Sequence, residues 1–275
     1  MKRLFLIIFT AALVLIVSSC SKTNDSGNGR LIVKITDAPF PVDMVESAEV
    51  TITKIEIRKA GDGISDGTPF NVIWEGSETF DLLDLRNGVV EDLLNIDIPE
   101  GEYNLIRLYV DEASLKVRDG DNFSLKIPSG KQTGIKIFIR PGLVVEGGLT
   151  SELLLDFDLS RSFLMKGNMD SPAGIKGFAF KPVIRAVNNS TAGRLEGKVT
   201  DKNNVKIKAA SIIVKQDTVV ASAIADTMGY YAIIGLPSGT YSVIAAKENY
   251  DTVKVDGVKI IQGNRTILNF ILPNK

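Results

Sequence analysis

The sequence has no histidine and only one cysteine among its 275 residues. Without imidazole, the chain lacks the most common general base and the most common nitrogen ligand for metals. Nucleophile systems that pair serine or cysteine with histidine are therefore excluded. Because Cys20 is the single cysteine, zinc–thiolate sites, iron–sulfur clusters and disulfides within the chain are excluded too. We predict no catalytic residue, no metal site and no cofactor.

An excess of charge of either sign is also missing. The 32 basic and 33 acidic residues give a formal net charge of −1. Residues 1–19 carry Lys2 and Arg3 and no acid, so the rest of the chain has 30 basic against 33 acidic residues, or −3. This balance provides no electrostatic attraction to nucleic acid, and we predict no such partner.

A long apolar run, residues 4–17, follows Lys2 and Arg3 at the start of the chain. A basic start and a short apolar run are typical of a secretory signal, and the run falls short of the roughly 20 residues of a spanning helix. It ends in Val17-Ser18-Ser19-Cys20. This ending resembles the bacterial lipobox, in which small residues precede the cysteine that becomes the lipid-bearing first residue. We therefore predict that residues 1–19 are a lipoprotein signal peptide.

A lipidated Cys20 would hold the protein on a membrane. Each buried methylene contributes about 0.8 kcal/mol, so two or more acyl chains anchor a protein stably. Residues 20–29 are polar and contain glycine, and we predict that they form a flexible tether. Ser21 after the cysteine resembles an outer-membrane address of many Gram-negative systems. The predicted location is the cell envelope, with a lipid anchor in the outer membrane and the protein facing the periplasm or the cell surface.

From Arg30 onward the dominant hydrophobic period is two. Apolar residues alternate with polar ones over 123–127 and 153–159, as in strands with one buried face. Turn residues separate such segments, for example Asp119-Gly120-Asp121-Asn122, which predicts a hairpin turn. Long helical periodicity is absent. The fold class that this pattern predicts is all-β.

One predicted strand has a fault in its alternation. Val50 and Ile52 share one phase, whereas Ile55 and Ile57 share the other. A β-bulge near residues 53–54 would bring all four side chains to one face. The alternative is a strand with both faces buried.

Residues 188–193 are small or polar and mark a linker between two strand-rich segments. The length of the chain suits one or two domains. After the linker, seven short strand-like segments follow in about 80 residues, which favours a sandwich. We predict two β-sandwich domains in tandem, residues 30–187 and residues 194–275.

The two predicted domains share a short echo. Ile98-Pro99-Glu100-Gly101-Glu102-Tyr103 matches Leu236-Pro237-Ser238-Gly239-Thr240-Tyr241. The Pro-x-Gly pair makes a tight turn, and the tyrosine begins the next strand. We expect each ring to be buried, with its hydroxyl bonded back to the turn.

The second segment resembles the carboxypeptidase regulatory-like, or transthyretin-like, family. The resemblance is carried by residues 197–201, by Ala225-Asp226-Thr227-Met228-Gly229-Tyr230-Tyr231 and by residues 235–241. It implies a seven-stranded prealbumin-like sandwich that is usually a non-catalytic accessory module, and some relatives are grouped with carbohydrate-binding folds.

The first segment resembles a bacterial lipoprotein family catalogued as domain of unknown function 4382. The matching motifs are residues 31–39, Thr79-Phe80-Asp81-Leu82-Leu83-Asp84-Leu85, and residues 155–162. The resemblance implies an anchored, extracytoplasmic β domain with no established activity. Both resemblances describe fold better than function.

Two carboxylates and two tyrosines are the candidate ligand-binding residues. Alternation places Asp156 and Asp158 on one face of a strand, where they could act in glycoside hydrolysis or bind Ca²⁺. They could equally lie on a solvated face or bond arginine and loop amides. Tyr230 and Tyr250 are candidates for exposed sugar-stacking rings. The single tryptophan, Trp74, is expected to serve the core.

The leading hypothesis is a non-catalytic, lipid-anchored envelope protein that binds or displays a ligand. The expected ligand is a carbohydrate or a partner envelope protein. The alternatives are a hydrolase that uses Asp156 and Asp158, and a purely structural spacer. The first alternative predicts a pocket between the two carboxylates and an activity that Asp156→Asn removes.

Overall fold

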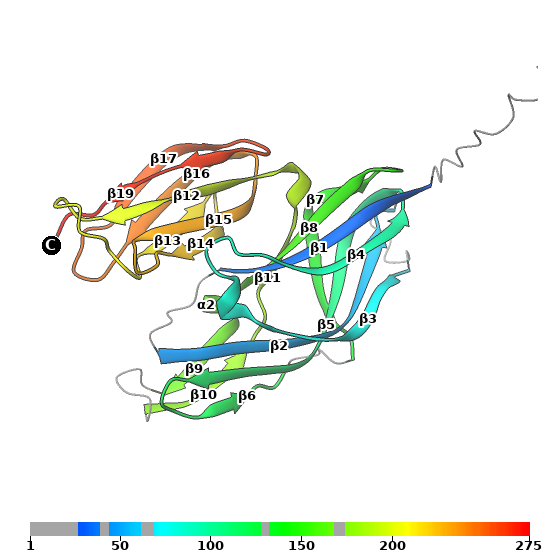
Figure 1. The fold of residues 1–275 in the computed structure, drawn as a ribbon, viewed down its shortest axis with the longest axis horizontal. Helices are drawn as coiled ribbons and strands as arrows, with labels where there is room; N and C mark the ends of the chain where they lie inside the picture. Colours follow the sequence, from blue (N-terminus) through cyan, green and yellow to red (C-terminus); the bar gives the residue numbers. More distant parts are fainter. Residues whose placement is uncertain (1–26, 39–43, 62–68, 128–131, 168–173) are drawn as a thin grey trace, which may run out of the picture.

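The computed structural model describes residues 27–38, 44–61, 69–127, 132–167 and 174–275. Cys20, the predicted signal peptide and all but the last three residues of the predicted tether lie outside this part. The described chain consists mainly of strands, which confirms the all-β fold class. Figure 1 shows two β-rich bodies arranged along the long axis, with the first described residues at one end and Lys275 at the other.

The first body is built on one large sheet. Its strand order is β3-β2-β5-β7-β11-β8-β1-β4, with β6 paired to β5. The pairs β1–β8 and β7–β11 are parallel and the other pairs are antiparallel. The strands are β1 Asn28–Ala38, β2 Val45–Lys59, β3 Asn71–Asp81, β4 Glu91–Pro99, β5 Gly101–Val117, β6 Asn122–Ser124, β7 Ile135–Val145, β8 Thr150–Asp158 and β11 Ile184–Asn188.

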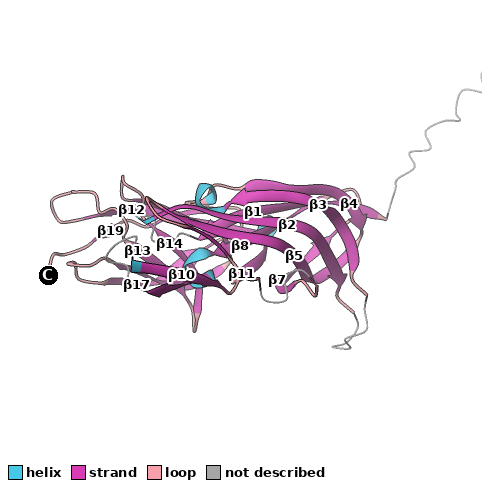
Figure 2. Ribbon diagram, turned by 90° about the horizontal axis from the view of Figure 1, so that it is seen from below, coloured by secondary structure: helices cyan, strands magenta, loops and turns pink. Residues whose placement is uncertain are grey.

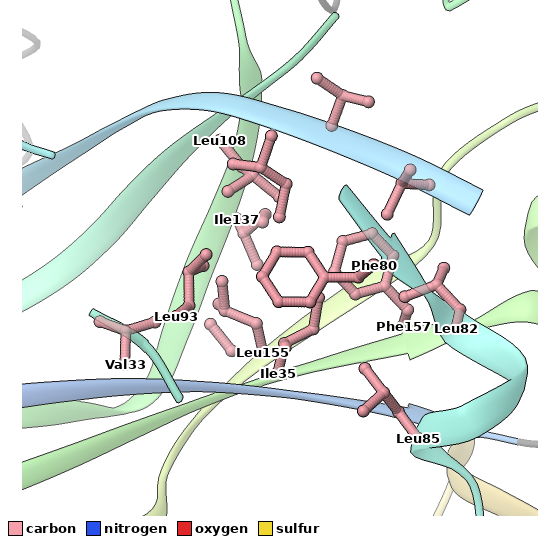
Figure 3. Packing of buried hydrophobic residues seen from close by; sticks show 14 of the residues in the cluster. Val33, Ile35, Phe80, Leu82, Leu85, Leu93, Leu108, Ile137, Leu155 and Phe157 are labelled. Carbon is pink, nitrogen blue, oxygen red and sulfur yellow. The ribbon is translucent and has the colours of Figure 1, made fainter. Parts of the chain in front are cut away.

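This sheet curls until its two edge strands, β3 and β4, contact each other. The curled halves enclose one hydrophobic core to which both contribute. Figure 3 shows part of that core, where Phe80 and Phe157 lie among aliphatic side chains from opposite walls. Short elements complete the body: η2 Leu82–Leu85, α2 Leu159–Ser162, and a separate hairpin of β9 Phe163–Gly167 and β10 Ile175–Phe180.

The predicted bulge is present in β2. The register shifts between Ile52 and Lys54 in the pairing of β2 with both β3 and β5. As a result Val50, Ile52, Ile55 and Ile57 are all buried in the same core. The bulge therefore corrects the phase of the strand, because one extra residue turns the later side chains back to the buried face.

The second body is a two-layer sandwich, seen beside the first in Figure 2. One sheet has the order β15-β12-β18, with β19 also paired to β12, and the other has the order β14-β13-β16-β17. β18 and β19 pair with consecutive parts of β12 in the same direction, so they act as one interrupted strand. Counted in this way, the sandwich has the seven strands that the sequence predicts. The strands are β12 Ala192–Thr200, β13 Ser211–Lys215, β14 Val219–Ile224, β15 Tyr230–Pro237, β16 Gly239–Ala246, β17 Val253–Ile260, β18 Arg265–Ile267 and β19 Phe270–Ile271.

Both tyrosines of the sequence echo are buried and bonded as expected. The hydroxyl of Tyr103 donates to the carbonyl of Pro99 at 2.7 Å, and that of Tyr241 donates to the carbonyl of Pro237 at 2.7 Å. Burial raises the pKa of both phenols. Each hydrogen bond ties the start of a strand to the turn before it, so these residues are structural.

Residues 188–193, the predicted linker, connect the two bodies as an ordered segment. They form the end of β11, the 3-10 turn η4 Asn189–Thr191 and the start of β12. The side chain of Asn189 donates to Glu152 at 2.9 Å, and Ser190 accepts a hydrogen bond from the Glu152 backbone at 2.8 Å. Small polar residues here make specific hydrogen bonds to the first body, which holds the connection in place.

Candidate functional site

The two bodies meet at Arg185, which lies on β11 opposite Asp156 on β8. The guanidinium donates twice to Asp156 Oδ2, from Nη2 at 2.6 Å and from Nε at 3.1 Å. Its remaining donors reach the second body, where they contact the carbonyls of Gly235 at 2.7 Å and Ile234 at 3.3 Å. Arg185 therefore joins a carboxylate of the first body to the backbone of the second.

Apolar contacts surround this polar junction. Leu154 and Val187 are buried, yet they belong to neither hydrophobic core. They lie against Gly235, which has a positive φ of 65°. A Cβ at that position would come within 2.7 Å of Leu154 Cδ2. Glycine is required here both for the backbone conformation and for the close approach of the bodies.

The sequence-predicted pair Asp156 and Asp158 is close to this junction, but both carboxylates already have partners. Asp156 is buried and paired with Arg185. Asp158 caps α2, where its Oδ1 accepts from the Arg161 backbone at 3.1 Å and from the Ser160 hydroxyl at 2.7 Å. Its Oδ2 pairs with the Arg161 side chain at 2.8 Å. These are the partners that the alternative interpretation of the sequence named: arginine and nearby backbone amides.

A third carboxylate, Asp37, lies in the family motif of residues 31–39 and was not a candidate site residue. It is 4% exposed, its Oδ1 accepts from the Leu159 backbone at 3.3 Å, and its Oδ2 has no hydrogen-bond partner. Burial and the neighbouring charge of Asp156 raise the pKa of Asp37. Burial also raises the pKa of Asp156, against the opposing effect of Arg185. No local pattern distinguishes Asp37, because its burial results from the distant segment 157–159.

A groove of about 670 Å³ lies beside the junction and is lined by both bodies. The first body supplies the outer face of β7, on which Lys136, Phe138 and Arg140 alternate with the buried Ile137 and Ile139. From the second body, the turn between β13 and β14 faces them. The turn supplies the polar side chains of Gln216 and Thr218, and the start of β14 supplies the exposed apolar side chain of Val219.

Phe138 is the exposed aromatic residue of this groove. Its side chain is 56% exposed, and the guanidinium of Arg140 lies 5.2 Å from the ring centroid. Asp158 and Arg161 line the same groove. The sequence marked Asp158 as a candidate but missed Phe138. The strand pattern could have identified Phe138, because it lies between Ile137 and Ile139, and adjacent residues of a strand point to opposite faces.

Tyr230 and Tyr250 lie elsewhere in the second body and do not line this groove. Tyr230 is half-buried and its hydroxyl donates to Glu196 at 3.1 Å. Tyr250 is half-buried, packs against the second core and forms a backbone bridge with Asn274. The structure therefore does not bring the four predicted site residues together. Trp74 is half-buried and packs against the first core.

Two further observations concern metals and membranes. Within the described ranges, there is no cluster of three or more carboxylates placed to hold a metal ion. The helices described in the structure include none long and apolar enough to cross a bilayer.

A sequence model of one family matches residues 28–182, more than half of the chain, and the family is described as Domain of unknown function (DUF4382). The chain belongs to this family. A second match follows the DUF4382 domain, between residues 194–273 and the carboxypeptidase regulatory-like domain. Both matches confirm the resemblances seen in the sequence. No curated protein matches the chain significantly.

Several solved structures align with the DUF4382 chain at low similarity. The TIE protein of Bacillus anthracis has 14% identity and a TM-score of 0.26, and the alignment covers 90% of this chain but 34% of that one. This chain therefore spans about a third of that protein. The shaft pilin SpaA of Lactobacillus rhamnosus GG has 10% identity and a TM-score of 0.27, with 90% and 98% of the two chains covered. TM-scores this low support no functional comparison.

Proposed function

We propose that this DUF4382 protein is a non-catalytic, lipid-anchored protein of the cell envelope that binds a saccharide in the groove beside Arg185. The observation that carries the proposal is the exposed ring of Phe138 on the wall of a groove formed by both bodies. Ligand sites typically measure about 300–1,000 Å³ and combine apolar surface with a few polar groups. The groove has this size and this composition.

The chemistry of the groove suits a sugar ring. An aromatic face offers a flat apolar surface to the C–H groups of a pyranose, and Phe138 is the exposed aromatic ring of β7. Around it, Lys136 and Arg140 supply hydrogen-bond donors, whereas Gln216 and Thr218 can both donate and accept. Sugar hydroxyls need partners of both kinds, so this mixture suits a neutral saccharide.

The arrangement of the carboxylates favours binding over hydrolysis. A carboxylate pair that cleaves glycosides needs one protonated acid and one free nucleophile or base. Asp156 instead forms a two-pronged pair with Arg185, and Asp158 holds the first turn of α2 and Arg161. Each carboxylate therefore already has a structural task. Turnover of a bound saccharide that Asp156→Asn abolishes would support the hydrolase instead.

The anchor at Cys20 is supported by the lipobox-like sequence and by the position of the first strand. β1 begins at the end of the molecule away from the second body (Figure 1). A tether attached there would carry the second body away from the membrane. Incorporation of labelled fatty acid into the wild type, and its loss in Cys20→Ala, tests the anchor. Equal labelling of the two proteins would contradict it.

The saccharide site is tested with a soluble form that lacks residues 1–20. We expect this form to bind saccharides on a glycan array, and we expect Phe138→Ala to weaken binding of the best ligand by about tenfold, or ~1.4 kcal/mol. Calorimetric titration measures the affinity. Leu149→Ala is the matched control, because Leu149 is equally exposed at 56% but does not line the groove.

Two results would contradict the saccharide site. One is a wild-type protein that binds no saccharide, which leaves a structural spacer or a protein partner. The other is a Phe138→Ala variant that binds as tightly as Leu149→Ala. Circular dichroism of each variant shows whether the fold is intact, so a loss of binding is not confused with unfolding.

A further inference from the structure

A second cleft of about 460 Å³ lies at the other end of β14 and shares no lining residue with the groove. Three basic side chains from three separate segments line it. Arg86 follows η2, Arg118 lies in the turn between β5 and β6, and Lys208 lies in the connection between β12 and β13. The first two belong to the first body and Lys208 belongs to the second, so the cleft is formed by the contact between the bodies.

Local hydrogen bonds fix the position of Arg86 on one wall. Asp81 caps η2 by accepting from the Leu83 backbone at 3.0 Å, and it also accepts from the Ala48 backbone at 3.0 Å. The hydroxyl of Thr36 donates to the carbonyl of Val89 at 2.7 Å, just beyond η2. This wall is therefore held to β1 and β2, and it presents Arg86 in a fixed place.

Two of the three cations of the cleft have no carboxylate partner. Among the described residues, no carboxylate forms an ion pair with Arg118 or Lys208. Arg86 differs, because its Nε donates to the carbonyl of Leu83 and its charge acts on the buried Asp37. Two carboxylates do line the cleft. Asp226 accepts hydrogen bonds from the backbones of Met228 at 2.7 Å and Tyr230 at 2.9 Å, and Asp84 is exposed. The cleft thus offers unpaired positive charge together with hydrogen-bond acceptors.

The acceptors of the cleft are carboxylate oxygens. Asp84 and Asp226 line it together with the basic side chains. A carboxylate accepts hydrogen bonds and so requires a donor, which a simple inorganic anion such as chloride does not provide. A ligand that carries both an anionic group and hydroxyl groups satisfies the two requirements.

We propose that this cleft binds a carboxylated saccharide, such as a uronic-acid oligosaccharide, with the carboxylate between Arg118 and Lys208 and hydroxyls at Asp84 and Asp226. Guanidinium groups bind carboxylates with paired, charge-assisted hydrogen bonds. Asp84 and Asp226 accept from hydroxyls and oppose a ligand that carries only negative charge. The proposal does not rest on the Phe138 groove, since the two sites share no residue.

The test measures binding of trigalacturonic acid to the soluble form at low and high salt. We expect Arg118→Ala combined with Lys208→Ala to weaken this binding by about tenfold or more. Both side chains are exposed, so the double variant should fold. The matched control is Lys176→Ala with Lys202→Ala, which removes the same charge from exposed positions outside the cleft. That control should bind as the wild type does.

Neutral and non-sugar probes separate the parts of the proposal. Galactotriose lacks the carboxylate and citrate lacks the sugar ring, and we expect both to bind more weakly than trigalacturonic acid. Equal losses in the two double variants would show a non-specific charge effect and overturn the proposal. Absence of binding to the wild type would overturn it as well.

Discussion

At the scale of single residues, three aspartates that follow similar sequence patterns have different environments. Asp158 lies near the surface and caps a helical turn. Asp156 is buried with an arginine that neutralises it. Asp37 is buried next to Asp156 with only one hydrogen bond to its carboxylate. An ionised Asp37 is therefore destabilising, because burial and Asp156 both oppose its charge.

Replacing Asp37 with asparagine should stabilise the protein at neutral pH. An unfolded aspartate ionises near pH ~3.9, whereas the pKa of folded Asp37 is raised. Between these two pKa values the folded state binds more protons than the unfolded state, so stability of the wild type falls as the pH rises above about 4. The Asp37→Asn variant lacks this decline.

We expect the gain at neutral pH to reach at least about 1 kcal/mol, since one unit of pKa shift corresponds to ~1.4 kcal/mol. Urea unfolding of both proteins at pH 4 and at pH 8 measures it. Near pH 4 the variants should be nearly equal. If the free energies of unfolding of the two proteins change in parallel between pH 4 and pH 8, the prediction is wrong. The neighbouring Arg86 would then compensate the charge of Asp37.

At the scale of strands and turns, the sequence allowed good predictions wherever the cause was local. The bulge of β2 follows from the mismatch between Ile52 and Ile55, and a mismatch within one strand can be seen in that strand alone. The two buried tyrosines follow from a turn four residues earlier. In such cases the interacting groups are close in sequence, so the local residue pattern is enough to predict the interaction.

The sequence alone did not reveal features whose cause was distant in the chain. The segment 188–193 has the composition of a linker, and its order depends on hydrogen bonds with Glu152 on β8. The alternating pattern of residues 153–159 is consistent with Asp156 on a solvated face. In the fold, however, β11 places Arg185 against Asp156, and Arg185 also bonds the second body. Neither partner can be identified without the strand order. The same is true of the two clefts, which exist only because the bodies meet.

The structure explains what the polar residues of the family motifs do in the fold. Thr36 and Asp37 end β1, Asp81 caps η2, and Asp158 caps α2. The hydroxyl of Thr36 donates to the carbonyl of Leu85, the last residue of η2, at 3.1 Å, and Asp37 accepts from the Leu159 backbone in α2. The motifs thus meet at one end of the curled sheet. Their polar residues fasten turns to the sheet.

At the scale of the whole molecule, Arg185 controls how the bodies are joined. The alanine variant would leave Asp156 buried without a counter-charge and the carbonyls of Ile234 and Gly235 without their donor. Breaking a buried ion pair by removing one partner costs about 3–5 kcal/mol. Because the Arg185 side chain is 23% exposed, we expect a loss near the lower end, about 3 kcal/mol.

Arg185→Ala should also loosen the junction. We expect a larger radius of gyration in small-angle X-ray scattering and faster proteolytic cleavage in residues 188–193, since the bodies would then be joined mainly by that connection. Arg194→Ala is the matched control. Arg194 is exposed, and its partner Glu196 keeps a second ion pair with Arg265 at 3.0 Å, so this variant should lose less than about 1 kcal/mol.

A second substitution separates the two roles of Arg185. If the destabilisation comes from the unpaired charge of Asp156, then Asp156→Asn in the Arg185→Ala background should recover much of the stability, because an amide is less costly to bury than a carboxylate. The scattering profile should stay expanded, since the hydrogen bonds from Arg185 to the second body are still missing. A compact double variant would show that Leu154, Val187 and Gly235 hold the bodies together without the arginine.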